Sequence, residues 1–226
     1  FTVSVNNTND SPTALALSAT AINENSAGAV VGTLTVTDPD SSDTYTYTLT
    51  GDDKDSFEVV NGQLKLKDSV TADYENKTSY AVTVTATDSG GASTSQAFSV
   101  SVNNTNDAPT LAIALSDQSV NEDAAFSFTV PTNTFNDVDA GDSLTYTATL
   151  SDGSALPSWL SFNTSTQTFT GTPVNANVGN ITVTVTASDG SATVSDSFTL
   201  TVANTNDTPT LANALSDQSV NEDAAF

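Results

Sequence analysis

The sequence has no cysteine, no histidine and no arginine, and it has only four lysines. Without cysteine there can be no disulfide, no thiolate metal site and no thiol nucleophile. Without histidine the chain lacks the commonest general base and the commonest ligand of transition metals. A serine or threonine nucleophile would have no histidine to activate it. Paired carboxylates could cleave sugars, but the acidic pairs here recur in repeated loops, so we expect a protein that is not an enzyme.

Basic charge is scarce as well. The four lysines stand against 27 acidic residues, which gives a formal net charge of −23. All four lie within residues 54–77, so acidic side chains from residue 78 onward have no basic partner in their own segment. The negative electrostatic field of such a chain disfavours nucleic acid and anionic membrane surfaces as partners. Either a solvated acidic surface or bound cations would account for the charge.

Long apolar runs are also missing. No stretch approaches the roughly 18 consecutive apolar residues of a membrane span, and no segment has the form of a signal peptide. We therefore expect no direct membrane insertion in this segment. The sequence starts and stops within repeated patterns, at Phe1 and at Phe226, which indicates an excerpt of a longer array.

A short motif of the form Asn-Thr-Asn-Asp-x-Pro occurs three times. Its aspartates are Asp10, Asp107 and Asp207, roughly 100 residues apart. Recurrence at a fixed, domain-sized spacing is typical of tandem repeats, and a cluster of polar residues closed by proline is typical of a junction. We predict a last strand and linker over residues 1–10, one domain over 11–107, a second over 108–207 and the start of a third over 208–226.

Short runs rich in threonine, valine and tyrosine, with alternating apolar and polar residues, fill each repeat and predict strands. In the first full repeat they are residues 31–37, 45–49, 57–60, 63–66, 80–86 and 98–102. In the second they are residues 126–130, 144–150, 169–171, 181–187 and 198–202. Residues 1–5 have the same pattern and predict the last strand of a preceding unit. Alternation without helical periodicity predicts an all-β fold of Greek-key sandwiches.

Oxygen-bearing side chains recur in register in the predicted loops. Each repeat has an acidic triplet, an Asn-Glu pair near its start and an aspartate after its fifth run. The triplets are Asp38, Asp40 and Asp43, and Asp137, Asp139 and Asp142; the pairs contain Glu24 and Glu122, and the later aspartates are Asp88 and Asp189. Each of these residues alone is an ordinary turn or surface residue. Together, oxygen ligands without nitrogen or sulfur favour calcium, which takes 6–8 oxygens.

These motifs resemble a cadherin repeat over nearly all of the first unit. They are Asn-Glu-Asn at 23–25, Asp-Pro-Asp at 38–40, Asp-Tyr-Glu at 73–75, the Asp88 turn and the Asn-Thr-Asn-Asp linker. In that family the Glu, the Asp-x-Glu and the linker of one domain hold calcium with the Asp-x-Asp and the later Asp of the next. The resemblance implies tandem immunoglobulin-like (cadherin-like) β-sandwiches in an elongated array.

Carried onto this sequence, the resemblance implies three groups of calcium ligands. At the junction between the two full repeats they are Glu24, Asp73, Glu75, Asn104, Asn106, Asp107, Asp137, Asp139 and Asp189. Before the first repeat they are Asn7, Asn9, Asp10, Asp38, Asp40 and Asp88. After the second repeat they are Glu122, Asn204, Asn206 and Asp207.

The second repeat resembles the dystroglycan-type cadherin-like repeats of large bacterial surface proteins, including RTX-type adhesins. The matching segments are residues 119–123, 157–162 and 170–173. This repeat has no Asp-x-Glu, and Asn175-Ala176-Asn177 stands at about that position. Because fewer carboxylates predict weaker calcium binding, the junction after the second repeat is expected to be the weaker site.

Two functions remain open at this point. The first is a calcium-rigidified extension or adhesion segment of a secreted or surface-anchored bacterial protein, with neighbouring repeats of the same chain as partners. Cell-surface glycans or polysaccharide are further candidate partners. The alternative is a calcium-dependent carbohydrate-binding module. Trp159, the only tryptophan, could be a sugar platform, but its place between Pro157 and Leu160 favours a buried anchor; Tyr45 and Tyr47 share a strand face and favour packing roles.

Overall fold

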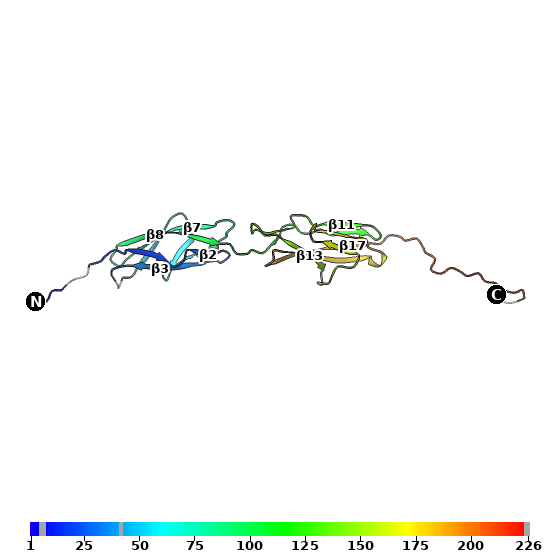
Figure 1. Cartoon of the computed structure of the whole chain (residues 1–226), viewed down its shortest axis with the longest axis horizontal. Coiled ribbons are helices and arrows are strands. Elements are labelled where there is room, and N and C mark those ends of the chain that lie inside the picture. Colours follow the sequence, from blue (N-terminus) through cyan, green and yellow to red (C-terminus); the bar gives the residue numbers. More distant parts are fainter. Residues whose placement is uncertain (5–7, 41–42, 224–226) are drawn as a thin grey trace. The chain divides into compact units, whose positions relative to one another are not determined.

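The computed structural model describes residues 1–4, 8–40 and 43–223. The chain divides into two compact units (Figure 1), one formed by Phe1–Asp107 with Val138–Gly141 and one by Ala108–Asp137 with Asp142–Phe226. Each unit has its own hydrophobic core. Strands dominate both, and the only helices among the described residues are two single 3₁₀ turns, η1 (Lys54–Ser56) and η2 (Asn175–Asn177).

Unit 1 contains two four-stranded sheets. The first has the order β1 (Ala14–Leu17), β3 (Val30–Thr37), β6 (Gln63–Leu66), β5 (Phe57–Val60), with every pair antiparallel. The second has the order β2 (Ala21–Asn23), β8 (Ser93–Asn103), β7 (Ser79–Thr87), β4 (Thr46–Thr50). In the second sheet β2 runs parallel to β8, and the other pairs are antiparallel.

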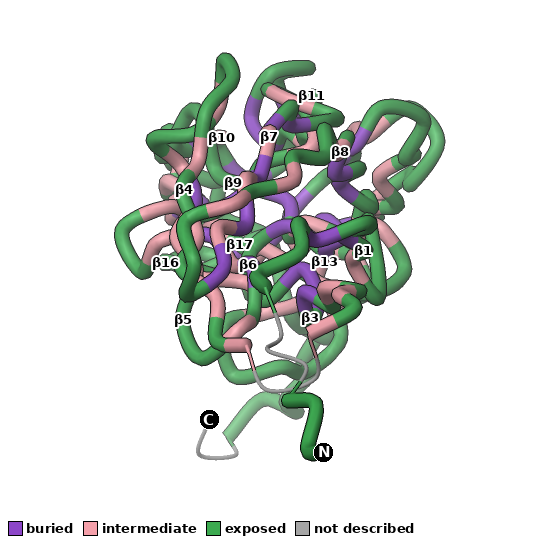
Figure 2. The backbone as a smooth tube through the Cα atoms, turned by 90° about the vertical axis from the view of Figure 1, so that its left-hand side faces the viewer, coloured by how far each residue is buried: buried purple, intermediate pink, exposed green. Residues whose placement is uncertain are grey.

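The core of unit 1 lies between these sheets. Along β7 the side chains of Val82, Val84 and Ala86 are buried while the intervening threonines are more exposed. They share one core with Leu64 and Leu66 of the other sheet. Because strand side chains alternate between faces, one face of each sheet is dry and the other faces water. Buried and exposed positions accordingly alternate along the backbone (Figure 2).

Unit 2 repeats the plan with a different division of strands. Its larger sheet has the order β10 (Gln118–Asn121), β17 (Thr193–Ala203), β16 (Gly179–Ser188), β13 (Thr145–Leu150), and β10 runs parallel to β17. A second sheet has the order β11 (Phe126–Thr129), β15 (Thr168–Gly171), β14 (Leu160–Asn163). The short strands β9 (Thr110–Leu111) and β12 (Phe135–Asn136) pair separately.

The core of unit 2 is aromatic. Phe169 on β15 lies 4.5 Å from Phe162 and 5.6 Å from Phe198, measured between ring centroids. Phe128 lies 5.2 Å from Phe198 in an edge-to-face arrangement. Such geometry is preferred because the edge of one ring is positive and the face of the other is negative. Val183 and Val185 of β16 complete the packing from the larger sheet.

The structure confirms the all-β fold, and each run predicted in the two full repeats overlaps a strand. Six strands were not predicted: β1, β2, β9, β10, β12 and β14. Residues 1–4 are exposed and form no strand here, and Val5 lies outside the described residues; that residues 1–5 are the last strand of a preceding unit stays a prediction. No helix in the described part of the chain is long and apolar enough to span a membrane.

Candidate metal centres

Three aspartates gather in the loop that follows β3 in unit 1. Asp38, Asp40 and Asp43 each offer a carboxylate oxygen, and these atoms lie within 4.8 Å of one another. The Asp40 amide donates to Asp38 Oδ1 (2.9 Å), and Ser89 Oγ donates to Asp43 Oδ1 (2.8 Å). The remaining oxygens, Asp38 Oδ2 and Asp43 Oδ2, are buried without a hydrogen-bond partner. Buried carboxylate oxygens of this kind are costly unless a cation or a donor satisfies them.

The linker that precedes unit 1 reaches the same loop. The Asp10 amide donates to Asp40 Oδ2 (2.7 Å), and Asn9 Nδ2 donates to Asp88 Oδ2 (3.1 Å). Burial raises the pKa of Asp88, but hydrogen bonds from Asn9 and from the following backbone amides outweigh it and hold the pKa below its ordinary value. Asn7, which was predicted as a ligand here, lies outside the described residues.

Tyr45 stands beside this acidic loop. Burial raises the pKa of its phenol above the ordinary value, and the negative charges of Asp38, Asp43 and Asp88 raise it further. Tyr47, two residues further on, packs against the core as the sequence suggested. Tyr45 therefore belongs to the surroundings of the acidic loop, a role that the alternation of the strand did not indicate.

A second cluster lies at the other end of unit 1, where Glu24, Glu75 and Asp107 offer oxygens within 4.8 Å of one another. Glu24 is only 2% exposed. Its Oε1 accepts from the Thr105 amide (2.7 Å) and its Oε2 accepts from the Tyr74 amide (2.6 Å). One buried carboxylate thus fastens both the Asp-Tyr-Glu loop and the linker to the end of β2.

The linker supplies further atoms to this cluster. Asn104 Nδ2 donates to Glu75 Oε1 (3.0 Å), and Asn25 Nδ2 donates to Asp107 Oδ1 (3.0 Å). The Asp107 amide donates to Asp139 Oδ2 (2.7 Å), and the segment Val138–Gly141 groups with unit 1.

Two further predicted ligands of this group make local hydrogen bonds. Asn106 uses its side-chain amide on the Asp107 carbonyl (2.7 Å). Asp73 accepts from the Asn76 amide (2.8 Å), in a local turn. The structure therefore gives both residues a local hydrogen bond beside the cluster.

Electrostatic repulsion is concentrated in this cluster. Burial raises the pKa of Glu75, and the negative charges of Glu24, Asp139 and Asp107 raise it further. Burial likewise raises the pKa of Asp107, with a further rise from Glu24 and Asp139 that the hydrogen bond from Asn25 only partly opposes. A like charge within a few ångströms disfavours the ionised form. A bound divalent cation would reverse that penalty.

In unit 2 the acidic loop is built from Asp137, Asp142 and Asp189, whose ligand atoms also lie within 4.8 Å of one another. Asp189 Oδ1 accepts from the amides of Ser191 and Ala192 (2.6 Å each), which orients the carboxylate in its turn. Asp139 is buried and is not one of these three residues.

The last predicted site lies at the far end of unit 2 and carries fewer charges. Glu122 is 2% exposed; its Oε1 accepts from Asn204 Nδ2 (2.6 Å) and from the Thr205 amide (2.7 Å). Its Oε2 is buried without a hydrogen-bond partner. Asn206 Nδ2 donates to the Asp207 carbonyl (3.2 Å), and Asp207 Oδ2 accepts from Asn175 (2.9 Å). No group of three acids forms at this end within the described residues.

The backbone shows why this end differs. The Asp123 amide donates to the Pro173 carbonyl (2.7 Å), as the Asn25 amide donates to the Ala72 carbonyl (3.0 Å) in unit 1. Residues 174–176 therefore occupy the place of the Asp-Tyr-Glu segment of unit 1. The sequence alone predicts residues 175–177 at that place, one residue later. Val174 and Ala176 replace the two acids. Among the described residues of unit 2, none replaces the Tyr74 amide as a donor to the second oxygen of the glutamate.

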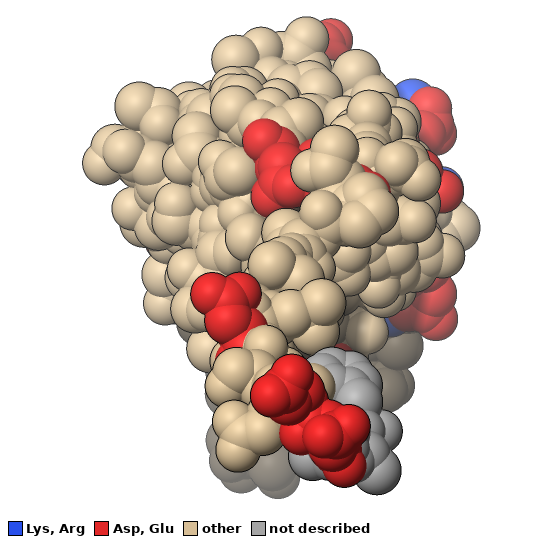
Figure 3. Space-filling model, turned by 90° about the vertical axis from the view of Figure 1, so that its right-hand side faces the viewer, with Lys and Arg blue, Asp and Glu red and all other residues tan. Residues whose placement is uncertain are grey.

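All of these clusters are made of carboxylate oxygens, most with asparagine side chains beside them, and oxygen is the ligand atom that calcium prefers. The residues fit calcium at both ends of unit 1 and in the acidic loop of unit 2, and they fit it less well at the far end of unit 2. The scarcity of lysine supports this interpretation. On the face shown in Figure 3, the few lysine atoms lie next to acidic ones. Lys54, Lys65 and Lys77 are engaged by acidic neighbours in ion pairs.

The clusters include residues that the family motif does not contain. Asp43 and Asp142 belong to the two acidic loops; their recurrence in the triplets was the signal for them. Asn25 and Asn175, which donate to Asp107 and Asp207, stand in segments that the sequence singles out, but neither was predicted as part of a metal site. Their role depends on contacts between segments far apart in the sequence.

Two family models match the chain. Residues 18–103 match the Cadherin domain, and residues 108–203 match He_PIG, described as “Putative Ig domain”. A search of curated proteins found no match.

Solved cadherin structures share the fold. The EC1-2 structure of human protocadherin-24 is 20% identical, with a TM-score of 0.60, and the match covers 89% of this chain and all of that one. Extracellular cadherin domains 1-5 of protocadherin gamma B2 are 22% identical with a TM-score of 0.58, covering 88% of this chain and 41% of that one. The protocadherin gammaB7 EC3-6 cis-dimer structure is 23% identical with a TM-score of 0.53, covering 84% of this chain and 50% of that one.

The chain thus spans half or less of the two longer protocadherin structures. At these identities the likeness concerns the fold. Together with the two family matches, it shows that the chain carries a cadherin-like and an Ig-like β-sandwich domain in tandem.

Proposed function

We propose that this chain is a calcium-binding, calcium-rigidified extension or adhesion segment of a large secreted or surface-anchored bacterial protein. One observation carries the proposal: the linker is itself part of the acidic cluster at the end of unit 1. Thr105 is hydrogen-bonded to Glu24, Asn104 to Glu75, and Asp107 contributes its carboxylate. An ion bound there restrains the linker because the linker supplies its ligands.

Three clusters would hold the ions. At the end of unit 1 the ligands would be Glu24, Glu75 and Asp107, with Asp139 in reach of the Asp107 amide. In the acidic loop of unit 1 they would be Asp38, Asp40 and Asp43, and in that of unit 2 Asp137, Asp142 and Asp189. Calcium supplies two positive charges, which offset the repulsion that raises the pKa values of Glu75 and Asp107.

The remaining parts of the proposal rest on the family resemblance. Neighbouring repeats of the same chain are the expected partners, with repeats running over residues 11–107 and 108–207. The expected location is extracellular, at the bacterial cell surface, and the role is non-enzymatic. Cadherin-like domains, which both the family match and the shared fold indicate, generally serve as calcium-dependent adhesion or extension repeats.

Calcium titration calorimetry tests the proposal. We expect saturable binding to the whole chain, and a loss of at least one binding event in the double variant Glu75→Gln, Asp107→Asn. Asp217→Asn is the matched control, because Asp217 is an exposed acid outside every cluster. Equal binding by the double variant and the control would refute the assignment of this cluster, and an absence of binding at millimolar calcium would refute the proposed function.

A further inference from the structure

A small cavity in unit 2 lies beside the only tryptophan of the chain. Its volume is about 240 Å³. It is lined by Pro157 and Trp159, which precede β14, and by residues 176–181, which run from η2 into β16. No charged residue lines it, although the chain as a whole carries a net charge of −23.

Trp159 is held firmly on one side and open on the other. It is half-buried and packs against the core of unit 2. Gly171, its neighbour on β15, has no room for a larger side chain, since a Cβ there would overlap the Trp159 carbonyl oxygen and lie 3.0 Å from Cε3 of the indole. The ring is therefore fixed against β15, while its remaining surface lines the cavity.

Several polar groups that line the cavity are available for hydrogen bonds to a ligand. The indole N–H of Trp159 makes no hydrogen bond to any described residue and is not among the buried atoms, so it can donate to a ligand. Asn180 is exposed, and its side chain has no hydrogen bond to any described residue. Asn177 uses only its Oδ1, on the Val174 amide (2.9 Å), so its NH₂ group remains available.

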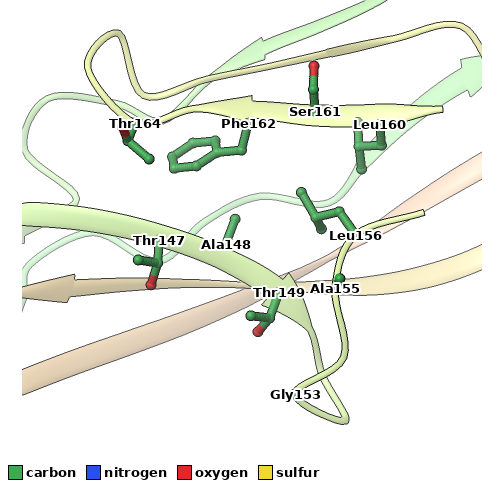
Figure 4. A pocket seen from close by; sticks show the side chains of 10 residues that line it. All are labelled: Thr147, Ala148, Thr149, Gly153, Ala155, Leu156, Leu160, Ser161, Phe162 and Thr164. Atoms are coloured by element: carbon green, nitrogen blue, oxygen red, sulfur yellow. The ribbon is translucent and has the colours of Figure 1, made fainter. Parts of the chain in front are cut away.

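The larger cavity of unit 2 lacks this combination. It measures about 570 Å³ and lies between β13 and β14 (Figure 4). Leu156, Leu160 and Phe162 point into it and Ser161 points away, and the polar side chains among its lining residues are hydroxyls alone. Apolar side chains without fixed amide groups do not define one ligand class. The Trp159 cavity defines one ligand class, because an apolar ring lies beside several polar groups that have no partner for hydrogen bonding among the described residues.

We propose that the Trp159 cavity binds one ring of a neutral sugar, without calcium. The apolar C–H face of the sugar packs on the indole, and its hydroxyl groups exchange hydrogen bonds with Asn180, with the Asn177 amide and with the indole N–H. The absence of cationic residues, in a strongly acidic chain, excludes acidic sugars as preferred ligands. The proposal is independent of the calcium sites, which use other residues.

The experiment uses Trp159 as its own reporter. Because the chain has a single tryptophan, its fluorescence reports this cavity directly. The whole chain is titrated in EDTA with neutral oligosaccharides of glucose, galactose, mannose and N-acetylglucosamine, and with oligogalacturonate as the acidic comparison. We expect a saturable change with at least one neutral oligosaccharide and a weaker response to oligogalacturonate.

Variants locate the binding. Asn180→Ala is expected to weaken it about fivefold to tenfold, from the loss of one or two hydrogen bonds. Trp159→Phe keeps an apolar ring for the core and is expected to weaken binding at least tenfold, as followed by NMR of the Asn180 and Ile181 amides. Ile113→Ala is the control, since it removes an exposed apolar side chain that does not line the cavity.

Three results would overturn the proposal: no saturable response to any neutral oligosaccharide in EDTA, tighter binding of oligogalacturonate, or unchanged affinity in both cavity variants. Each leaves the calcium assignment untouched, because calcium titration measures that separately.

Discussion

At position 171 only a hydrogen atom fits, because β14 and β15 approach closely there. Leu160 and Gly171 are register partners, and the Trp159 carbonyl occupies the place of a Cβ. We predict that Gly171→Ala lowers the free energy of unfolding of unit 2 by about 1–3 kcal/mol, as overpacking does.

Urea unfolding followed by Trp159 fluorescence measures this effect. Ser165→Ala, in the exposed turn between β14 and β15, is the control and should change stability by less than about 0.5 kcal/mol. Equal stability of Gly171→Ala and the wild type would contradict the packing described here.

Asp53 is a second residue whose surroundings define a test. Burial raises its pKa, but hydrogen bonds from Lys77 and from the Ala81 amide outweigh burial and hold the pKa below its ordinary value. A lowered pKa in the folded state stabilises the fold above the unfolded pKa of about 3.9, and this contribution is lost as the pH falls through the folded value.

We therefore predict that Asp53→Asn lowers the stability of unit 1 by about 1–2 kcal/mol at pH 7, because Lys77 is partly exposed and its hydrogen bond is partly screened. The deficit relative to the wild type should shrink below about pH 4. Urea unfolding followed by NMR signals of β7 measures it, with Asp217→Asn as a control of equal charge. A deficit that grows on acidification would contradict the sign of the pKa shift.

At the scale of single residues, the sequence predicts the acidic residues of the clusters better than the asparagines that donate to them. Asp38, Asp40 and Asp43 repeat in register as Asp137, Asp139 and Asp142, so their recurrence is visible in the order of residues alone. Asn25 binds Asp107, which lies 82 residues further along the chain. A contact across such a distance depends on how the strands are arranged, which local residue patterns do not encode.

At the scale of elements, one buried carboxylate holds three segments at the end of unit 1. Glu24 follows β2 and accepts from the Tyr74 amide of one loop and the Thr105 amide of the linker. Hydrogen bonds to a charged acceptor are stronger than those to a neutral one. Glu24→Gln should therefore speed hydrogen exchange at both amides.

Exchange measured by NMR, without calcium, checks this expectation, with the more exposed Glu58→Gln as control. Glu122→Gln should speed exchange at Thr205, since that is the only backbone amide bonded to the Glu122 carboxylate in the described residues. Unchanged exchange at Tyr74 and Thr105 in Glu24→Gln would show that the carboxylate does not hold these segments.

Strand prediction succeeded for every long strand and for some short ones, and all the strands that it missed are short. The nine residues of β7 alternate throughout, and the predicted run overlaps nearly all of it. The strands β2 and β10 have three and four residues, and each pairs in parallel with the last strand of its unit. Their pairing is set by the distant β8 and β17, so a local pattern does not reveal it.

At the scale of the whole molecule, the separate cores predict that each unit folds without calcium. Calcium should then raise the free energy of unfolding of units that are already folded. Each unit buries its own apolar side chains, so removal of calcium should leave the β-sheet circular dichroism spectrum unchanged. A ligand that binds only the folded state adds about 2.7 kcal/mol to the free energy of unfolding when its concentration is one hundred times its Kd.

We therefore expect the melting temperature to rise with calcium concentration and to rise less in the variant Asp38→Asn, Asp43→Asn, which loses part of one cluster. Calorimetry in EDTA and in calcium gives the comparison, with Asp217→Asn as control. A melting temperature that does not depend on calcium would contradict binding to the folded state.

The most direct test of the account is small-angle X-ray scattering of the whole chain in calcium and in EDTA. Salt is kept near 0.15 M so that long-range repulsion is screened. Because the linker residues Thr105 and Asp107 belong to the cluster at the end of unit 1, we predict a larger maximum dimension and a narrower spread of conformations with calcium, and no such change in Glu75→Gln, Asp107→Asn. The same maximum dimension in calcium and in EDTA would contradict the claim that calcium stiffens the linker.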